Sequence, residues 1–420
     1  MDYSMGKLFE FLDVLHFFPI YGKLARFAKE NVSYVSHFWI SHSSKGFFRV
    51  GLFLAALVAI SCLYLIISPN LLPADVSYDV PKETNSIKGC NVFEGRWITD
   101  DRSPLYNASL CPFAEDGFDC LANGRRDSTY LKWRWKPHKC DIPRVRVEAA
   151  LKALRGKRIV FVGDSLGRSQ WESLICLLMA GVDDKRTVYE VNGNKISKQI
   201  GFLSVVFSTV DLRIDFYRSV FLVQPGQVPR RSPKRVRSTI SLDKLDEISH
   251  EWIDSDVLIF NTGHWWTPSK LFELGCYFKQ KGSLKLGMPI NTAFRIALQT
   301  WAAWAEAFIQ PSKTRVFFRT FGASHWRGKS HLTCKVTRRP LMKAEDKGRN
   351  PFSDSIIRLT KKMKLPVSVL HITPIAAARS DAHIGSWGDN PSKPDCSHWC
   401  LPGVPDMWNE ILLAHLMYND

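Results

Sequence analysis

The chain has 420 residues, of which 45% are hydrophobic and 23% are charged, and this composition excludes an intrinsically disordered protein. The length allows one large domain or two ordinary ones. The net charge of +17 favours acidic partners such as nucleic acid, an anionic membrane or an acidic polysaccharide. The basic residues are spread along the chain without a nucleic-acid-binding motif, so we expect no nucleic-acid partner.

One segment near the amino terminus is a candidate membrane span. Val50–Ile67 is uncharged, almost wholly apolar and about long enough to cross a bilayer. Lys45 and Arg49 precede it, so we predict a cytosolic tail (1–49) and a lumenal remainder. A cleaved signal peptide is the rival interpretation, which the long polar region before the apolar run disfavours. A buried core helix is a second, weaker alternative, because this run shows no polar face. We interpret 68–89 as a stem linker.

Cysteine usage supports the lumenal placement. Nine of the ten cysteines follow the span, a density typical of disulfide formation in the secretory pathway. The number is odd, so at least one thiol is expected to stay free or to pair between chains. A zinc site is the alternative, but the chain has no pair of Cys-x-x-Cys units, and we predict no metal. Asn107-Ala-Ser109 is a glycosylation sequon on the same side.

The lumenal part, 90–420, divides into two regions. Residues 90–150 are loop-like and rich in Gly, Asp, Asn and Trp, so this region would need disulfides to hold its shape. Residues 151–420 have an α/β pattern. Its first strand is predicted at Arg158–Val162 and its first helix at Leu166–Met179.

Further strands and helices alternate along the rest of the chain. This alternation predicts a mostly parallel sheet flanked by helices on both faces. The Pro- and Arg-rich loop 224–238 could hold an anionic substrate, or it could be a solvated surface loop. The predicted strands are Leu203–Phe207, Leu212–Val223, Asp256–Phe260, Arg315–Thr320 and Val367–Ile372, and the predicted helices are Thr292–Ile309 (capped by Asn291 or Thr292), Ser353–Met363 (capped by Ser353) and Val404–Leu416 (with Pro405 in its first turn).

Ser165 is the candidate nucleophile. It follows Gly163 and Asp164 at a strand-to-helix turn, above the carboxyl end of a parallel sheet, where α/β proteins bind ligands. The exposed amides of the helix start favour developing negative charge. The alternative is an ordinary Gly-Asp-Ser turn without catalytic function.

Asp395 and His398 are the candidate partners of that nucleophile. Three residues apart on a turn, they can face the same way, so that the carboxylate fixes the imidazole tautomer and the other ring nitrogen takes a serine proton. Cys396 and Cys400 bracket His398 and would pin the turn. The alternative is a surface loop held by disulfides.

Other residues are candidates for oxyanion or substrate binding. The Ser165 amide and the Asn261 side chain are candidate oxyanion donors, and Gly193 either adds a backbone amide or forms an ordinary turn. Tryptophans after the strands are either sugar platforms or core aromatics, and two arginines either bind uronate carboxylates or form internal ion pairs. The remaining candidates are Gly163, Asp164, His264, Trp265, Trp266, Trp326, Arg168 and Arg379.

Five segments carry a family resemblance: Cys90–Trp97, Lys132–Cys140, Gly163–Ser165, Asn261–Trp266 and Asp395–Asn409. Together these segments resemble the plant trichome birefringence-like family. The resemblance covers roughly Cys90 to the carboxyl terminus, and its long carboxyl-terminal signature is highly specific. One departure is the basic segment Lys335–Arg339, where many members carry a Glu-Thr pair.

The resemblance implies a function and a location. Family members are Golgi type II membrane proteins similar to SGNH/GDSL esterases, and they are implicated as O-acetyltransferases of wall polysaccharides such as xylan, mannans, xyloglucan and pectins. It therefore implies Ser165 as nucleophile, His398 as general base and Asp395 as its orienter, acting through an acetyl-serine. No cofactor is expected to be bound, but an acetyl donor is required. The alternatives are a bridging protein that keeps pectin esterified, and an acetylesterase.

The resemblance also implies a disulfide pairing. No oligomeric state is predicted. The implied pairs are Cys90–Cys140, Cys111–Cys176, Cys120–Cys396 and Cys334–Cys400, with Cys276 free.

Overall fold

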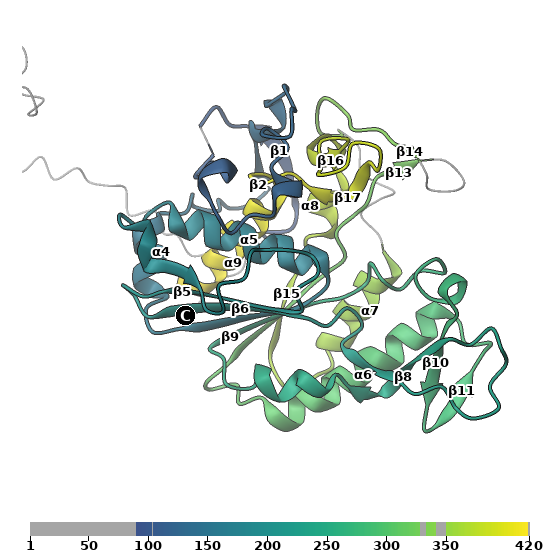
Figure 1. The fold of residues 1–420 in the computed structure, drawn as a ribbon. Coiled ribbons are helices and arrows are strands. Elements are labelled where there is room, and N and C mark those ends of the chain that lie inside the picture. Colours follow the sequence, from purple (N-terminus) through teal and green to yellow (C-terminus); the bar gives the residue numbers. More distant parts are fainter. Residues whose placement is uncertain (1–89, 103, 328–332, 342–349, 419–420) are drawn as a thin grey trace, which may run out of the picture. The chain divides into compact units, whose positions relative to one another are not determined.

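A computed structural model describes residues 90–102, 104–327, 333–341 and 350–418 (Figure 1). The predicted tail, membrane span and stem therefore lie outside the described residues. No helix within those residues is long and apolar enough to cross a membrane.

A seven-stranded sheet forms the centre of the fold, in the order β15-β12-β9-β3-β6-β5-β4 (Figure 1). The strands from β15 to β6 are parallel, and β5 and β4 extend one edge antiparallel. The mostly parallel sheet predicted from the sequence is thus confirmed. The strands are β3 (Arg158–Gly163), β4 (Val188–Glu190), β5 (Phe202–Phe207), β6 (Leu212–Arg218), β9 (Val257–Asn261), β12 (Arg315–Arg319) and β15 (Val367–Leu370).

Helices cover both faces of this sheet. One apolar cluster joins it to α4 (Val147–Ala153), α5 (Ser165–Met179) and α9 (Val404–Tyr418). A second cluster joins it to α6 (Ile290–Phe308) and α7 (Pro351–Thr360). β3 is buried on both faces, as the near-continuous apolar run of a central parallel strand requires.

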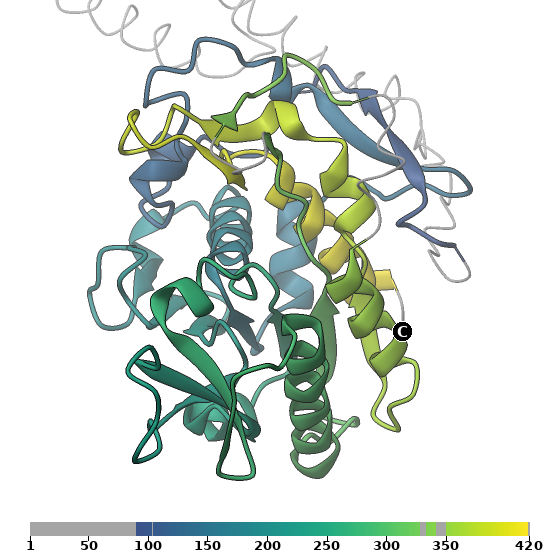
Figure 2. The ribbon, with the colours of Figure 1, turned by 90° about the vertical axis from the view of Figure 1, so that its right-hand side faces the viewer.

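A second, four-stranded sheet lies beside α6 and was not predicted (Figure 2). The predicted strand Leu212–Val223 is wrong in its length, because β6 ends at Arg218 and Leu222 adopts a positive φ of 62° that interrupts the extended backbone. The chain then enters the second sheet, and the Pro- and Arg-rich loop joins its first two strands. These strands are β7 (Val223–Gly226), β8 (Ser238–Leu245), β10 (Cys276–Gln280) and β11 (Ser283–Lys285).

Two predicted helix starts need correction. α6 begins at Ile290 after Pro289, and neither Asn291 nor Thr292 caps it. α7 is capped by Asn350, whose side chain accepts hydrogen bonds from two helix amides, because Ser353 already lies within the first turn. α7 ends at Thr360, before the predicted Met363. The closing helix α9 begins at Val404 with Pro405 in its first turn, as predicted.

The region after Cys90 contains little regular structure, and polar contacts join it to the sheet domain. The Trp97 indole donates to the Ile375 carbonyl, and Glu115 pairs with Arg168 on α5. The elements not yet given are β1 (Gly95–Thr99), β2 (Trp133–Pro137), β13 (Trp326–Arg327), β14 (Thr333–Cys334), β16 (His383–Gly385), β17 (Asp395–Trp399), α8 (Thr373–Ala377) and 3-10 turns at Ala108–Leu110, Asp116–Phe118, Thr129–Leu131, Lys185–Thr187, Glu247–Trp252, Phe272–Leu274 and Ser380–Ala382.

Four disulfides hold the described chain together. Cys90–Cys140 and Cys111–Cys176 form as expected, and Cys276 is free. The other two expected pairs, Cys120–Cys396 and Cys334–Cys400, are wrong, because the structure has Cys120–Cys400 and Cys334–Cys396.

Backbone contacts explain the exchanged partners. The Leu401 amide donates to the Phe118 carbonyl, which brings Cys400 beside Cys120. The His325 amide donates to the Cys396 carbonyl, and Trp326 pairs with Cys334 across β13 and β14. Cys334 is therefore held next to Cys396.

Removing the Cys334–Cys396 bond is expected to lower the free energy of unfolding by about 2–4 kcal/mol, the usual effect of a disulfide closing a loop of this size. The bond spans 62 residues and ends on the strand that carries His398. Thermal unfolding of the Cys334→Ser/Cys396→Ser variant measures the effect. Cys276→Ser is the control, expected within about 0.5 kcal/mol. Equal stability of the double variant and the control would contradict the prediction.

Candidate active site

The turn between β3 and α5 presents Ser165. Asp164 caps α5, because its Oδ1 accepts a hydrogen bond from the Leu166 amide at 2.9 Å. Ser165 is the first residue of the helix and is half-buried, whereas the rest of α5 is buried. The Ser165 amide belongs to the first turn, so it has no acceptor within the helix. The hydroxyl and a polarised amide thus lie together at the carboxyl end of the sheet.

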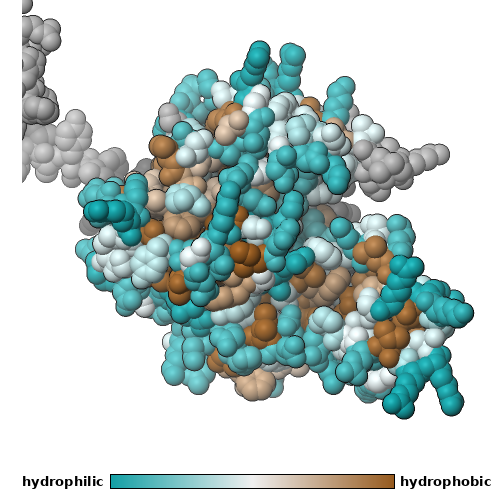
Figure 3. All heavy atoms as spheres, viewed as in Figure 1, coloured by the Kyte–Doolittle hydropathy of each residue, from teal (hydrophilic) through white to brown (hydrophobic). Residues whose placement is uncertain are grey.

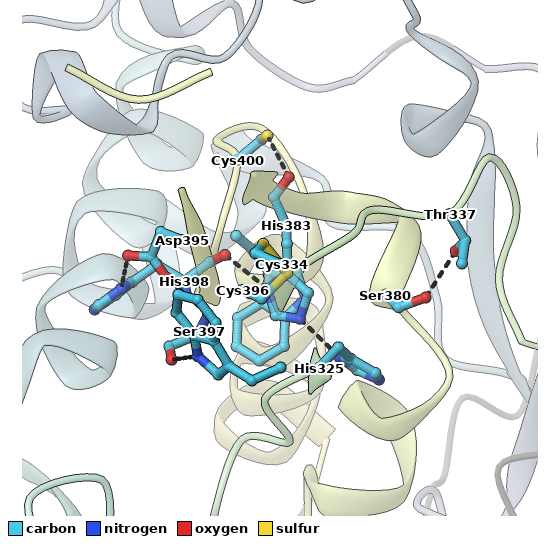
Figure 4. Close-up of a disulfide and its surroundings, with 12 residues drawn as sticks. His325, Cys334, Thr337, Ser380, His383, Asp395, Cys396, Ser397, His398 and Cys400 are labelled. Atoms are coloured by element: carbon cyan, nitrogen blue, oxygen red, sulfur yellow. Dashed lines mark hydrogen bonds and ion pairs between the residues drawn. A yellow bond between two sulfur atoms is a disulfide. The ribbon is translucent and has the colours of Figure 1, made fainter. Parts of the chain in front are cut away.

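Ser165, His398 and Asp395 form a continuous hydrogen-bonded chain. His398 Nε2 lies 2.7 Å from Ser165 Oγ, and His398 Nδ1 lies 2.7 Å from Asp395 Oδ2. The other Asp395 oxygen accepts from the Ser397 and His398 amides, which fixes the carboxylate on β17 (Figure 4). Because a carboxylate only accepts, Nδ1 carries the proton, and Nε2 is free to accept the serine proton.

The electrostatics of the pair suit this role. Burial would raise the pKa of Asp395, but His398 and the two backbone amides hold it well below its ordinary value. Burial would lower the pKa of His398, but the Asp395 carboxylate raises it above the ordinary imidazole value. The ring of Phe118 stacks on His398 at 5.7 Å between centroids. Asp395 therefore stays ionised beside an imidazole whose pKa it raises.

Asp164 is the buried anchor of the nucleophile turn. Asn261 Nδ2 donates to its Oδ1 at 2.6 Å, and His264 Nδ1 lies 3.5 Å from its Oδ2. Burial would raise the pKa of Asp164, but His264, Arg319 and Asn261 hold it well below its ordinary value. His264 is itself fixed by a hydrogen bond to the Gly322 carbonyl and by stacking on Phe321. These side chains fix Asp164 and thereby position Ser165, the next residue in the chain.

The structure gives the candidate oxyanion donors different surroundings. The Asn261 side chain lies against Gly163 and Gly167, where a Cβ atom would overlap its Oδ1, and one of its N–H bonds is directed at Asp164. The Gly193 amide donates to the Glu190 carbonyl at 3.1 Å, which is the ordinary turn of the alternative interpretation. The Ser165 amide thus remains the donor best placed beside the hydroxyl.

The arginine candidates do not face substrate. Arg168 is buried between Glu115 and Glu172, and burial raises the pKa of Glu172 to about 7. Arg379 is buried, pairs with Asp381 and donates to the Tyr130 carbonyl. Both therefore form the internal ion pairs of the alternative interpretation.

The tryptophan candidates divide between core and surface. Trp266 is buried and donates to Thr262 Oγ1, so it is a core aromatic. Trp265 and Trp326 are partly exposed. The Trp326 indole donates to Ser397 Oγ, between the two catalytic candidates of β17. Trp265 and Trp326 therefore remain candidate platforms for a sugar ring.

Sequence analysis missed two buried histidines behind His398. His383 Nδ1 donates to the His398 carbonyl at 2.7 Å, and His383 Nε2 lies 2.7 Å from His325 Nδ1 (Figure 4). Burial lowers the pKa of His383 to about 3, so this ring is neutral. The pair holds the backbone of β17, which carries His398. No sequence pattern marks a single buried histidine as a positioning residue.

No group of three or more His, Cys, Asp or Glu side chains in the described ranges is arranged to hold a metal ion. The site itself brings together an activated hydroxyl, a base oriented by a carboxylate, and helix-start amides for an oxyanion. This set suits acyl transfer or ester hydrolysis.

Comparisons with known proteins agree with this chemistry. Residues 142–415 match the family described as a GDSL/SGNH-like acyl-esterase family found in Pmr5 and Cas1p, and residues 88–141 match the Pmr5 amino-terminal domain. The chain is 56% identical to trichome berefringence-like 7 of Arabidopsis thaliana over 370 residues, 87% of this chain and 83% of that protein. It is 39% identical to trichome birefringence-like 9 of the same plant, over 88% of this chain and 93% of that protein.

The family match extends over both the catalytic turn and the Asp395–His398 segment. The likeness to the two relatives covers most of each chain. The chain therefore belongs to the trichome birefringence-like family, and its residues 142–415 form a domain of the GDSL/SGNH-like acyl-esterase family.

Proposed function

We propose that this chain is an O-acetyltransferase that places acetyl groups on hydroxyls of plant cell-wall polysaccharides of the pectin, xylan or mannan class. The observation that carries the proposal is the chain of two 2.7 Å hydrogen bonds from Asp395 through His398 to Ser165. A protein that only binds or bridges polysaccharide has no need of a hydroxyl aligned with a base and its orienting carboxylate.

The proposed reaction has two transfers. His398 Nε2 takes the Ser165 proton as Oγ attacks the acetyl carbonyl, the bond to the donor breaks, and the leaving group takes the proton from His398. A sugar hydroxyl then gives its proton to His398 and attacks the acetyl-serine, and Ser165 regains the proton. The Ser165 amide and the start of α5 stabilise the oxyanion in both steps. The chain supplies the nucleophile, the base and the oxyanion donor, and the acetyl donor and the acceptor sugar are the two substrates.

Labelled acetyl transfer tests the proposal. The full-length protein is incubated with an acetyl donor and with deacetylated pectin, xylan and mannan oligosaccharides, and the label is followed into oligosaccharide and into free acetate. We expect label in oligosaccharide and a transient acetyl group on the peptide that contains Ser165. Faster release of acetate from acetylated polymer would indicate an esterase, and binding without either reaction would indicate a bridging protein.

The glycine at position 167 is expected to be essential for the geometry of this site. Gly167→Ala places a methyl group against Asn261 and displaces the side chain that holds Asp164. Misplacement of a catalytic group by about 1 Å can cost about 10²-fold, so we expect kcat/KM for acetyl transfer to fall by about that factor. Gly287→Ala, where the added methyl meets nothing, is the control. A Gly167→Ala rate within twofold of the parent would contradict the prediction.

We also propose that the protein is a single-pass type II protein of the Golgi membrane with its catalytic part in the lumen. Four disulfides support an oxidising compartment. Asn107 is exposed, so its sequon is accessible to the glycosylation machinery. Protease protection of sealed membranes, together with a glycosidase-dependent mobility shift lost in Asn107→Gln, tests this topology.

A further inference from the structure

Two cations lie over Trp265 at the rim of the active site. The Arg218 guanidinium carbon is 5.4 Å and the Lys270 ammonium is 5.0 Å from the centroid of the ring, and Phe221 packs edge-on against it. Both cations are exposed. A bare tryptophan ring would suit a neutral sugar, but this ring has two positive charges close to it. We call Arg218, Trp265 and Lys270 the cation–tryptophan cluster.

The cluster lies close to the nucleophile. Arg218 ends β6 and is the register partner of Gly163 on β3, two residues before Ser165. Neighbouring strands are separated by about 4.8 Å. Trp265 follows β9, whose last residue, Asn261, holds Asp164. A ligand on the cluster therefore lies at the carboxyl end of the parallel strands, as the Ser165 hydroxyl does.

The two cations differ from the buried arginines nearby. Arg168 and Arg379 are each neutralised by a carboxylate, whereas neither Arg218 nor Lys270 pairs with an acidic side chain among the residues that the structure describes. Their charge is thus available to a ligand.

The positive surface continues onto the four-stranded sheet. Phe272, two residues after Lys270, contacts Tyr277 of β10, and the Arg235 guanidinium lies over the Tyr277 ring. Figure 3 shows long hydrophilic side chains projecting over β8, β10 and β11 at the lower right. Residues 224–245 and 265–288 contain only two acidic residues, Asp243 and Glu273, against Arg230, Arg231, Lys234, Arg235, Arg237, Lys244, Lys270, Lys279, Lys281 and Lys285.

We propose that the cation–tryptophan cluster and the adjoining basic face of β8 and β10 bind the carboxylates of a uronate-containing polysaccharide, which makes an acidic glycan the acceptor. The inference rests on the proposed transferase function. Arg218 offers a planar fork that matches a carboxylate, and Lys270 offers a second positive charge at the same tryptophan ring. A chain with carboxylates at regular intervals can contact the cluster and the basic face while presenting one hydroxyl to Ser165. An anionic membrane surface is the other occupant that a basic face could attract, and the vesicle arm of the binding measurement below separates the two.

The Arg218→Gln/Lys270→Gln variant of the full-length protein tests this assignment. Acetyl transfer is measured with an oligogalacturonide and with the same oligosaccharide as its neutral methyl ester. We expect KM for the acidic acceptor to rise about tenfold, the factor that corresponds to about 1.4 kcal/mol of binding, with kcat little changed. The parent's preference for the acidic acceptor should fall at high salt, because exposed charges are screened.

The control variant is Lys152→Gln/Arg155→Gln. It changes the net charge by the same amount at the end of α4, before β3, at the opposite end of the parallel strands. It should leave KM for the oligogalacturonide unchanged. Equal KM values for the acidic and the methyl-esterified acceptor in the parent, or equal effects of the two double variants, would overturn the inference while leaving transferase activity intact.

A binding measurement separates this inference from the proposed function. The Ser165→Ala protein is titrated with the oligogalacturonide and, in a second arm, with phosphatidylserine vesicles. If the oligogalacturonide binds in a salt-sensitive way and the two glutamine substitutions weaken that binding, the proposed glycan-binding surface is supported even if no transfer occurs. If the two glutamine substitutions reduced vesicle binding and left glycan binding unchanged, the inference would be overturned.

Discussion

Ser165→Ala is expected to reduce acetyl transfer by at least about 10⁴-fold, the scale on which removal of a triad nucleophile acts in serine enzymes. The substitution removes the atom that forms the acetyl-enzyme. It leaves the Ser165 amide, the Asp164 cap and the His398–Asp395 pair in place. Acceptor binding should therefore be retained, and the loss should fall on kcat.

Labelled transfer with purified parent and variant proteins gives the rate, and titration with acceptor gives the affinity. Ser355→Ala, which removes a half-buried hydroxyl that donates to the Pro351 carbonyl within α7, is the matched control and should leave the rate unchanged. Ser165→Ala with more than a tenth of the parent rate would mean that another group carries the acetyl. A variant that loses transfer and acceptor affinity together would instead point to a role of Ser165 in binding.

The elements around Ser165 could be predicted because their signals are local. Arg158–Val162 is a continuous apolar run, and the following residues have helical periodicity, so the strand, the turn and α5 are all visible in the sequence. The partnership of Ser165 with His398 spans 233 residues. It was predicted from the chemistry of the Asp395–His398 spacing and from the family resemblance, not from periodicity.

Other features depend on contacts that no local pattern records. Cys396 and Cys400 lie on the same short segment, and which of them meets Cys120 is decided by the path of the backbone around Phe118. Arg168 is neutralised in part by Glu115, 53 residues away. The sequence shows its charge but not its partner.

The Pro- and Arg-rich loop is a further feature whose surroundings the sequence does not reveal. Its composition allowed either a solvated loop or an anion site. The structure adds that the loop joins two strands of a basic sheet, and that this sheet adjoins the cation–tryptophan cluster beside Ser165. Neither β7 nor β8 was predicted: β7 has only four residues and contains Pro225, and β8 directly follows the Pro- and Arg-rich segment whose composition indicates a loop.

Asp395→Asn is expected to lower kcat/KM for acetyl transfer by about 10⁴-fold, because an amide in place of the carboxylate can hold the imidazole in the wrong tautomer. In the parent, the Asp395 carboxylate accepts from His398 Nδ1 and leaves Nε2 to accept the serine proton. An asparagine N–H directed at Nδ1 would move the ring proton to Nε2. Ser165 would then face a donor instead of a base.

The same substitution should move the acid limb of the pH profile. Only neutral His398 can take the serine proton, so transfer by the parent should fall as the pH decreases through the pKa of His398, which Asp395 raises despite burial. In Asp395→Asn the raising charge is gone and the lowering effect of burial remains. The residual activity should therefore persist to lower pH. Profiles of kcat/KM against pH for the parent, Asp395→Asn and the exposed control Asp389→Asn measure both effects. An acid limb at the same pH in the parent and in Asp395→Asn would show that a group other than His398 sets it.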